Sequence, residues 1–260
     1  MFRNLSELYK YRALIFALVT RHVRSRYRGS VLGFVWSFLN PLCLIAVYTL
    51  VFKNYIRFET DSSYPLFLLT GLLPWIWFNS GIIEATASIS SGGNLITKAM
   101  FPPQILPTVS ALTNLVNYLF ALPVLLVFLL WNDKVPGLTI VFLPVLVLIQ
   151  LVFILGLAYL FSALNVFYRD VQHVLGNLFS LLFFLTPVIY PLSTVPEKHQ
   201  RLMLFLNPLS YLMEMYRGVV LDNRLPEAIP LLWVSFVALF VFFLGSIVFN
   251  RNRESFAEYV

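Results

Sequence analysis

The chain has 260 residues, of which 59% are hydrophobic and 12% are charged, and its formal net charge is +6. Because a typical soluble domain carries about 25% charged residues, this composition excludes a protein whose whole surface faces water and indicates a lipid bilayer as the main solvent. The single cysteine, Cys43, lies in an apolar run and excludes a disulfide framework within the chain. The short apolar run Ala13–Val19 ends before Arg21 without a small-residue cleavage pattern, so a secretory signal peptide is not predicted.

Residues 1–28 are predicted to form an amphipathic helix that lies in the cytoplasmic membrane interface. At about 100° per residue, one arc holds Arg3, Lys10, Arg21, Arg24 and Arg28, and the opposite side holds Leu5, Leu8, Ile15, Phe16, Val19 and Val23. Arg12, Leu14 and Arg26 break this pattern, so the continuity of the helix stays open. The alternative is a solvated basic face that only sets the orientation of the chain in the membrane.

Six uncharged stretches of 22 to 34 residues follow, and each is long enough to cross the hydrocarbon as a helix, which takes about 20 residues. The fold class predicted for 29–260 is therefore an all-α membrane domain with six transmembrane helices. The expected spans are approximately 31–52, 64–84, 105–131, 139–165, 174–192 and 229–250. The uncharged interval Leu202–Met213 has only 12 residues, which is too short to cross the membrane. The segment 193–228 is therefore predicted to hold interfacial or re-entrant short helices before the last span.

The basic residues predict which loops face the cytoplasm, because cytoplasmic loops of membrane proteins carry an excess of Lys and Arg. The N-terminal segment, the 84–104 loop, the 166–173 loop and the C-terminal tail together hold eleven Lys/Arg and five acidic residues. The other loops hold seven of each kind. Both termini are therefore expected in the cytoplasm, with outer loops at 53–63, 131–138 and 191–230.

The predicted spans contain essentially no ionisable side chain, so no carboxylate is available in mid-membrane to couple transport to protons or sodium. The chain also lacks a G-x-x-x-x-G-K-[ST] phosphate loop, and His22, His173 and His199 have no metal-ligand spacing. We expect no catalytic residue, no metal and no cofactor bound by this chain. A passive conduit driven by a partner, or a scaffold, is the remaining interpretation.

Aromatic side chains make up 17% of the residues, and some lie away from the span ends, where an interfacial belt would place them. Trp75, Trp77 and Trp131 fit such a belt. The side chains that do not fit it are predicted to line a pore, and they are Phe34, Trp36, Phe38, Tyr48, Phe179, Phe183 and Tyr190. Aromatic faces can stack on the C–H faces of sugar rings without fixed hydrogen bonds, so a polymer could slide past them. Packing against lipid is the alternative for these residues.

Four sequence blocks resemble the membrane subunits of polysaccharide exporters of the type 2 ABC transporter family. They are "RYRGSVLGFVWSFLNPL" (Arg26–Leu42), "KAMFPPQILP" (Lys98–Pro107), "NVFYRDVQHVL" (Asn165–Leu175) and "NPLSYLMEMYRGVVL" (Asn207–Leu221). The blocks occur in the family's order, and the six-span layout is similar along the whole chain. The resemblance is greatest to O-antigen exporters, with capsule and teichoic acid permeases as relatives.

This resemblance implies partners and a substrate that composition does not show. Two copies of the chain would pair around one pore lined mainly by the first and fifth spans, in the inner membrane. Two separate ATPase subunits, which would bind ATP and magnesium, would dock on the cytoplasmic side. The substrate would be a polysaccharide on a polyprenyl-pyrophosphate lipid, and no nucleic acid would take part. The residues implied in ATPase coupling are Gly92, Gly93, Asn94, Leu95, Lys98, Phe101, Arg169 and Asp170.

Three arginines next to the first span suggest a hypothesis about the substrate's charged head group. Guanidinium groups suit phosphate recognition, and the span begins at about the depth of a pyrophosphate. We expect Arg24, Arg26 and Arg28 to receive the head group and to form a cytoplasmic gate with Tyr27, Gly29 and Ser30. The alternative is that the arginines set topology and bind anionic lipids.

Other functions remain open at this point. A same-family exporter could carry teichoic acid, capsule or a small lipid-like compound instead. A membrane-embedded enzyme acting on lipid-linked sugars would need acidic residues grouped at one membrane face. The carboxylates expected in the cytoplasmic loops, Glu84 and Asp170, are assigned to separate loops, which disfavours such an enzyme.

Overall fold

The computed structural model describes residues 7–29, 33–57, 63–93 and 102–259, and it contains no strand within those ranges. The main helices are α2 (Arg12–Tyr27), α3 (Trp36–Tyr48), α4 (Tyr64–Ser91), α6 (Ile105–Trp131), α7 (Leu143–Phe167), α8 (Val171–Leu185), α9 (Glu197–Leu206), α10 (Pro208–Val220), α11 (Ala228–Asn252) and α12 (Phe256–Tyr259). Short segments of tighter or wider helix are η1 (Gly33–Val35), η2 (Thr49–Tyr55), η3 (Leu138–Phe142) and η4 (Leu192–Thr194). The predicted all-α class is confirmed for the described residues.

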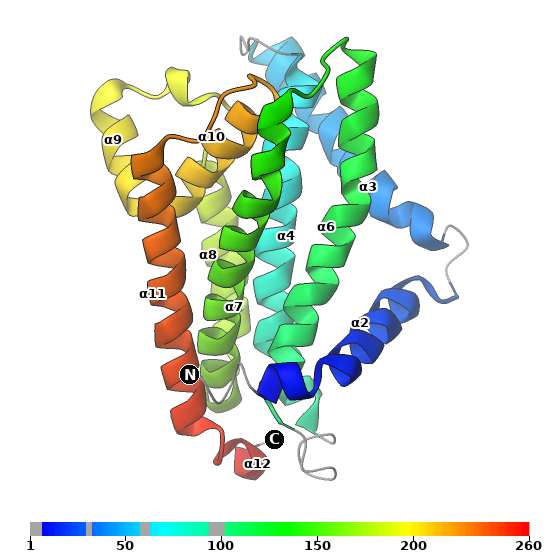
Figure 1. Cartoon of the computed structure of the whole chain (residues 1–260), viewed down its shortest axis with the longest axis vertical. Coiled ribbons are helices and arrows are strands. Elements are labelled where there is room, and N and C mark those ends of the chain that lie inside the picture. The colour runs from blue at the N-terminus through cyan, green and yellow to red at the C-terminus, as the bar shows by residue number, and fades with distance from the viewer. Residues whose placement is uncertain (1–6, 30–32, 58–62, 94–101, 260) are drawn as a thin grey trace.

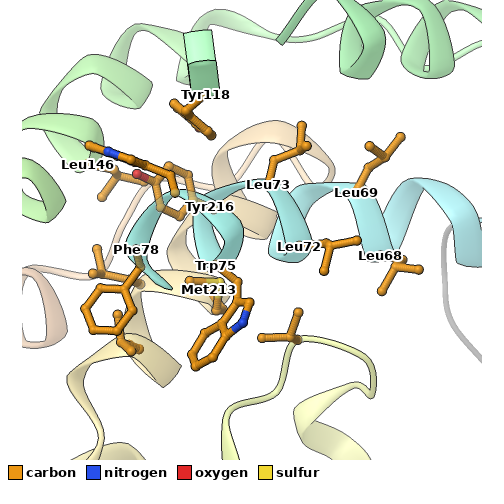
Figure 2. Close-up of a cluster of buried hydrophobic side chains, with 14 of the residues drawn as sticks. Leu68, Leu69, Leu72, Leu73, Trp75, Phe78, Tyr118, Leu146, Met213 and Tyr216 are labelled. Carbon is orange, nitrogen blue, oxygen red and sulfur yellow. The ribbon is translucent and has the colours of Figure 1, made fainter. Parts of the chain in front are cut away.

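Helix α4 forms the centre of the bundle (Figure 1). Four helical segments are long and apolar enough to cross a membrane, namely Tyr64–Ser91, Ile105–Trp131, Leu138–Phe167 and Ala228–Asn252. In the most apolar part of α4, 78% of the residues are buried inside the protein, against about a third or less in the other three segments. Figure 2 shows side chains from α6, α7 and α10 converging on α4, including Tyr118, Leu146, Met213 and Tyr216. Helix α4 therefore has protein on nearly every side, whereas the other long helices present apolar faces outward.

The first and fifth predicted spans are short helices in the structure. Helix α3 has 13 residues and continues into the seven-residue π-helical segment η2, and α8 has 15 residues. At about 1.5 Å per residue, α8 is roughly 22 Å long, less than the ~30 Å of a hydrocarbon core. It ends before the predicted boundary at 192 because Pro187 has no N–H with which to continue the helix.

Helix α4 continues to Ser91, past the expected span end at 84, and Glu84 within it pairs with Arg26. The membrane boundary at 84 stays a prediction. One detail of the sequence prediction is corrected inside the bundle. Trp75 and Trp77 are buried in the core and do not form an interfacial belt, whereas Trp131 is exposed at the end of α6. Trp77 stacks on Tyr118 of α6, with their ring centroids 5.0 Å apart.

The two sets of loops separated by charge lie at opposite ends of the bundle (Figure 1). Helix α2, the end of α4, the turn between α7 and α8, and α12 lie at one end. Helices α9 and α10 lie at the other end. The geometry thus agrees with the division that the basic residues predicted.

Helix α2 lies across the lower part of α6 in Figure 1. Ile15 and Val19 of α2 form a small core with Ile105 and Val109 of α6. Phe16, which the predicted apolar face also includes, is 74% exposed and points away from this core. The helical path from residue 7 is interrupted by a turn at Tyr11, so the N-terminal segment is not one continuous helix. Its placement in a membrane interface stays a prediction.

Helices α7 and α11 approach each other most closely at two glycines. A Cβ atom built on Gly245 would collide with the carbonyl oxygen of Gly156, and one built on Gly156 would lie 2.5 Å from the backbone nitrogen of Phe242. Small residues let the backbones of membrane helices come together, and the gain is dense van der Waals contact. This pair of glycines therefore allows α11 to pack in direct backbone contact with α7.

We predict that Gly245→Ala destabilises the protein, because the added methyl group overlaps backbone that cannot move away cheaply. Overpacking of this kind costs about 1–3 kcal/mol, and thermal unfolding of detergent-purified protein measures it. Gly176→Ala in α8 is the matched control, since no atom lies within 4 Å of a Cβ built there. Equal melting temperatures for the two variants would contradict the close packing.

Candidate functional site

Two cavities flank α3 and lie between it and the central helix α4. The first, about 330 Å³ in volume, is lined by residues of α2, α3, α4 and α6. The second, about 430 Å³, is lined by residues of α3, α4 and α8. Asn40 of α3 and Ser80 of α4 line both cavities. Helix α3 therefore separates two hollow regions, and one of them lies between the first and fifth predicted spans.

The second cavity brings together three of the aromatic residues singled out from the sequence. Tyr48 of α3 stacks on Phe183 of α8, with ring centroids 5.9 Å apart. Phe183 also contacts Trp75 of α4 at 5.5 Å, and Phe179 contacts Phe78 at 5.4 Å. These rings come from segments far apart in sequence, so the aromatic wall is a product of the tertiary fold.

Burial limits how much of this aromatic wall is open within a single chain. Phe179 and Phe183 are only 5% and 8% exposed, because they point toward α4. The opposite face of α8 carries the exposed apolar residues Val174, Leu178, Leu181 and Leu185. The pore-lining role of the aromatics stays a prediction.

The remaining predicted pore residues are more scattered. Trp36 is 48% exposed and lines the first cavity, and Phe38 is half-buried. The side chain of Phe34 lies outside the described residues. The Tyr190 hydroxyl donates a hydrogen bond to the carbonyl of Phe184 at 2.9 Å, so this ring covers the end of α8.

The three arginines next to the first span, Arg24, Arg26 and Arg28, are called the arginine collar. The collar contains an ion pair that the sequence did not predict. Nη2 of Arg26 donates to both carboxylate oxygens of Glu84, at 2.6 and 2.7 Å. The amide of Asn114 in α6 donates to the same carboxylate at 2.8 Å. A single carboxylate thus ties the end of α2 to α4 and α6. The only signal in the sequence is a lone Glu after a long apolar run, and such a residue is easily read as the start of a loop.

The other collar residues are described in part. Arg24 and Arg28 are exposed, and Gly29 has a φ of +80°, a left-handed conformation that favours glycine. The side chain of Tyr27 and the whole of Ser30 lie outside the described residues. The structure therefore brings the first cavity, Arg26 and Glu84 together at the lower end of α3.

The predicted coupling residues lie at the same end of the bundle as α2. Gly92 and Gly93 follow the last turn of α4, and Arg169 and Asp170 are exposed in the turn between α7 and α8. Asn94, Leu95, Lys98 and Phe101 lie outside the described residues. Nearby, Glu7 accepts a hydrogen bond from Gln104 and pairs with Arg253 at 3.6 Å. This end is therefore cross-linked between the N-terminal segment, the start of α6 and the end of α11.

A buried arginine organises the opposite end of the bundle. Arg217 of α10 is 4% exposed, and its Nη2 donates to the carbonyl of Val188 at 2.8 Å. Its Nη1 donates to Glu214 at 3.0 Å, and its guanidinium lies 3.7 Å from the ring centre of Phe67 in α4. Gly71 of α4 leaves the room for it, since a Cβ there would lie 2.8 Å from Nη2. Burial lowers the pKa of Arg217, and the neighbouring Glu214 carboxylate opposes that shift.

Two further residues fasten the turn that follows α8. The Tyr64 hydroxyl donates to the carbonyl of Ile189 at 2.7 Å. Asn207 caps α10 by accepting from the backbone N–H of Leu209, and its amide donates to the hydroxyl of Thr186 at 2.8 Å. The block Asn207–Leu221 therefore has a structural task, which is to hold α10 against α4 and the turn after α8.

Among the described residues, no group of three or more His, Cys, Asp or Glu side chains could hold a metal ion. The geometry instead consists of a membrane bundle, two cavities beside a loosely packed helix, and a cross-linked charged end. A chain with this composition and with four helices long and apolar enough to cross a bilayer is a multi-pass membrane protein.

Comparison with known proteins identifies the family. The family model described as "ABC-2 type transporter" matches residues 13–221, so the chain belongs to the ABC-2 type transporter family. The predicted resemblance is confirmed. The chain is 44% identical over 259 residues to the O-antigen export system permease protein RfbA of Myxococcus xanthus, covering 99% of both chains. It is 31% identical to the protein of the same name from Klebsiella pneumoniae (94% of each chain) and 26% identical to the polysialic acid transport protein KpsM of Escherichia coli (92% and 93%).

We predict that Arg217→Lys destabilises the protein, because an ammonium group cannot reproduce the planar fork that reaches both Glu214 and the Val188 carbonyl. Loss of a hydrogen bond to a buried charged group costs on the order of 2 kcal/mol. Thermal unfolding in detergent measures the change. Arg224→Lys is the matched control, since Arg224 is exposed and pairs with Asp222 at 3.6 Å. An unchanged melting temperature for Arg217→Lys would show that the two guanidinium hydrogen bonds do not contribute to the stability of the protein.

Proposed function

We propose that this chain is the membrane subunit of an ATP-driven exporter that moves a polyprenyl-pyrophosphate-linked polysaccharide of the O-antigen type out of the cytoplasm. The observation that carries this proposal is the similarity along 99% of the chain to a protein named as an O-antigen export permease. Similarity to a polysialic acid transport protein supports a polysaccharide cargo more broadly. The location that fits this role is the bacterial inner membrane.

The proposed topology has six transmembrane segments and both termini in the cytoplasm. Support comes from the four long apolar helices, the shorter apolar helices Phe38–Lys53 and Val171–Leu185, and the gathering of the basic segments at one end of the bundle. Each short helix reaches across the bilayer with the help of the turn that follows it. Helices α9 and α10 then form the outer re-entrant cap.

The proposed pore lies where two copies of the chain meet along α3 and α8. These two helices contact the bundle less extensively than the long helices, and both expose apolar side chains such as Val47 and Leu181. The cavity between them is lined by Tyr48, Phe179 and Phe183. Two ATPase subunits would dock at the opposite side of the membrane from α9 and α10, on the 92–104 loop and the α7–α8 turn.

The collar arginines are proposed to receive the pyrophosphate, with Glu84 as a competing anion. The bidentate pair occupies Arg26 in the described structure, and a phosphate would have to displace a carboxylate that accepts three hydrogen bonds. Because both partners are more than a third exposed, the pair is worth only about 0–1 kcal/mol. The diphosphate of such a substrate carries two charges in total, and it can therefore exchange with Glu84 at small cost.

The function itself is tested by deleting the chain from a cell that makes a long surface polysaccharide. We expect the polymer to disappear from the surface and to accumulate on its lipid carrier in the cytoplasm, and the tagged chain to co-purify with an ATPase. Accumulation of a capsule, a teichoic acid or a small lipid in place of this polymer would reject the O-antigen assignment.

We predict that Arg24→Gln, Arg26→Gln and Arg28→Gln each reduce polymer export and substrate-stimulated ATP hydrolysis, since each removes a guanidinium that phosphate could bind. Glu84→Gln should act in the opposite direction and raise the apparent affinity for the lipid-linked substrate by about two- to fivefold, because it weakens the competing pair. ATPase titrations on the purified complex measure both effects. If polymer export and substrate-stimulated ATP hydrolysis were unchanged in all three arginine variants, the arginines would serve only to set the topology.

We predict that Phe179→Leu and Phe183→Leu slow polymer export while assembly with the ATPase is preserved. Leucine fills much of the same volume but offers no aromatic face for a sugar ring to slide over. Phe249→Leu is the control, since this ring is equally buried but packs against Tyr159 and Phe256, away from both cavities. Normal export rates in the two α8 variants would show that these rings serve packing only.

A further inference from the structure

The first cavity, between α3, α4 and α6, has a composition that the proposed pore does not explain. Its polar lining consists of Asn40, Ser80, Asn114 and Asn117, together with Arg26. Aromatic residues Trp36, Trp77 and Tyr118 add flat surfaces to the same space. Its volume of about 330 Å³ is at the lower end of the range for small-molecule sites, about 300–1,000 Å³. The cavity therefore has room for a small ligand and not for a long stretch of polymer.

Several polar groups in this lining have no partner in the described part of the chain. Both amide atoms of Asn117 and the indole N–H of Trp77 are buried and make no hydrogen bond there. Buried polar groups are almost always hydrogen-bonded, because an unpaired one costs about 1–3 kcal/mol. Three such atoms belong to residues that line this one cavity, on two neighbouring helices, and a ligand bound there would supply the partners that they lack.

The charges around the cavity indicate that this ligand is neutral. Arg26 is the charged residue in the lining, and Glu84 already balances it. The amides of Asn40 and Asn117 offer both donors and acceptors, and hydroxyl groups need both. Both N–H groups of Asn114 already donate, to Glu84 and to the carbonyl of Ser110, so this amide offers a ligand only its oxygen. The ring of Trp77 is held in place by stacking on Tyr118 at 5.0 Å. Figure 2 shows that Tyr118 lies on the same side of α4 as Leu73, opposite to Trp75 and Phe78. The first cavity therefore extends to the side of α4 away from those rings, although Asn40 and Ser80 line the second cavity as well.

We propose that this cavity binds a single sugar ring, namely the one next to the diphosphate of the lipid-linked substrate. Amides that donate and accept, beside flat aromatic faces, match the hydroxyl groups and C–H faces of a pyranose. The neighbouring Arg26 then lies where the diphosphate of the same molecule would be. This inference rests on the proposed function and adds to it a subsite between α3, α4 and α6, on the side of α3 away from α8.

The test uses the complete permease–ATPase complex in lipid nanodiscs and two probes. One probe is polyprenyl diphosphate alone, and the other is polyprenyl diphosphate that bears one N-acetylhexosamine. The wild-type complex should bind the sugar-bearing probe at least about tenfold more tightly than the bare lipid, since a few neutral hydrogen bonds supply that much. Equal affinity for the two probes would overturn the subsite.

Two variants locate the preference at this cavity. Asn117→Leu removes both unpaired amide atoms, and Trp77→Phe removes the indole N–H while keeping a ring against Tyr118. Each should lower the sugar preference by about three- to tenfold and leave binding of the bare lipid unchanged. If Asn117 had only a structural role, Asn117→Leu would leave the sugar preference intact. Because the Asn117 amide has no hydrogen-bond partner to lose, this substitution should not lower the melting temperature.

Asn79→Leu is the matched control, since Asn79 lies on α4 and lines the other cavity. It should retain the full sugar preference. If Asn79→Leu lost the sugar preference and Asn117→Leu retained it, the sugar would bind in the second cavity, and the inference would be overturned. If the wild-type complex binds neither probe, the proposed lipid-linked substrate itself is rejected, which distinguishes failure of the function from failure of the subsite.

Discussion

Backbone polar groups inside a bilayer have no water to bond to, so each must be satisfied within the protein, and helices satisfy their own. Every other feature of this chain depends on that constraint. It explains why the described segments are helical. It also explains why α4 can be surrounded by other helices without leaving backbone N–H and C=O groups unpaired. The same constraint explains why the turn after α8 is held so firmly, since Tyr64 and Arg217 donate to backbone carbonyls that have left helical geometry, at Ile189 and Val188. Asn207 adds a hydrogen bond to the Thr186 hydroxyl in the same turn.

The bundle is divided into a tightly packed part and a loosely attached part. Helices α4, α6, α7 and α11 pack with dense contacts, and Gly156 and Gly245 allow two of them to touch through their backbones. Helices α3 and α8 lie beside this unit with cavities between them and α4. The described bundle therefore combines a dense unit with two loosely attached helices along one side.

Charge at the two ends has different roles. At the lower end, the pair of Arg26 and Glu84 is partly exposed, so water screens it and it contributes little stability. At the upper end, Arg217 is buried and hydrogen-bonds to Glu214 and to the Val188 carbonyl. The same residue type thus makes a weak contact in one place and a structural cross-link in the other, and burial makes the difference.

Composition and charge spacing were sufficient to predict a helical membrane protein and the division of its described loops between two ends, because the bilayer imposes length and polarity on each segment separately. They could not predict that Glu84 belongs to a helix, that Trp77 is buried, or which residues line each cavity. Those facts depend on side chains meeting across segments distant in sequence, as Arg26 meets Glu84 and Tyr48 meets Phe183. The sequence pattern shows which side chains of a segment are buried. Only the tertiary structure shows which residues of other segments they pack against.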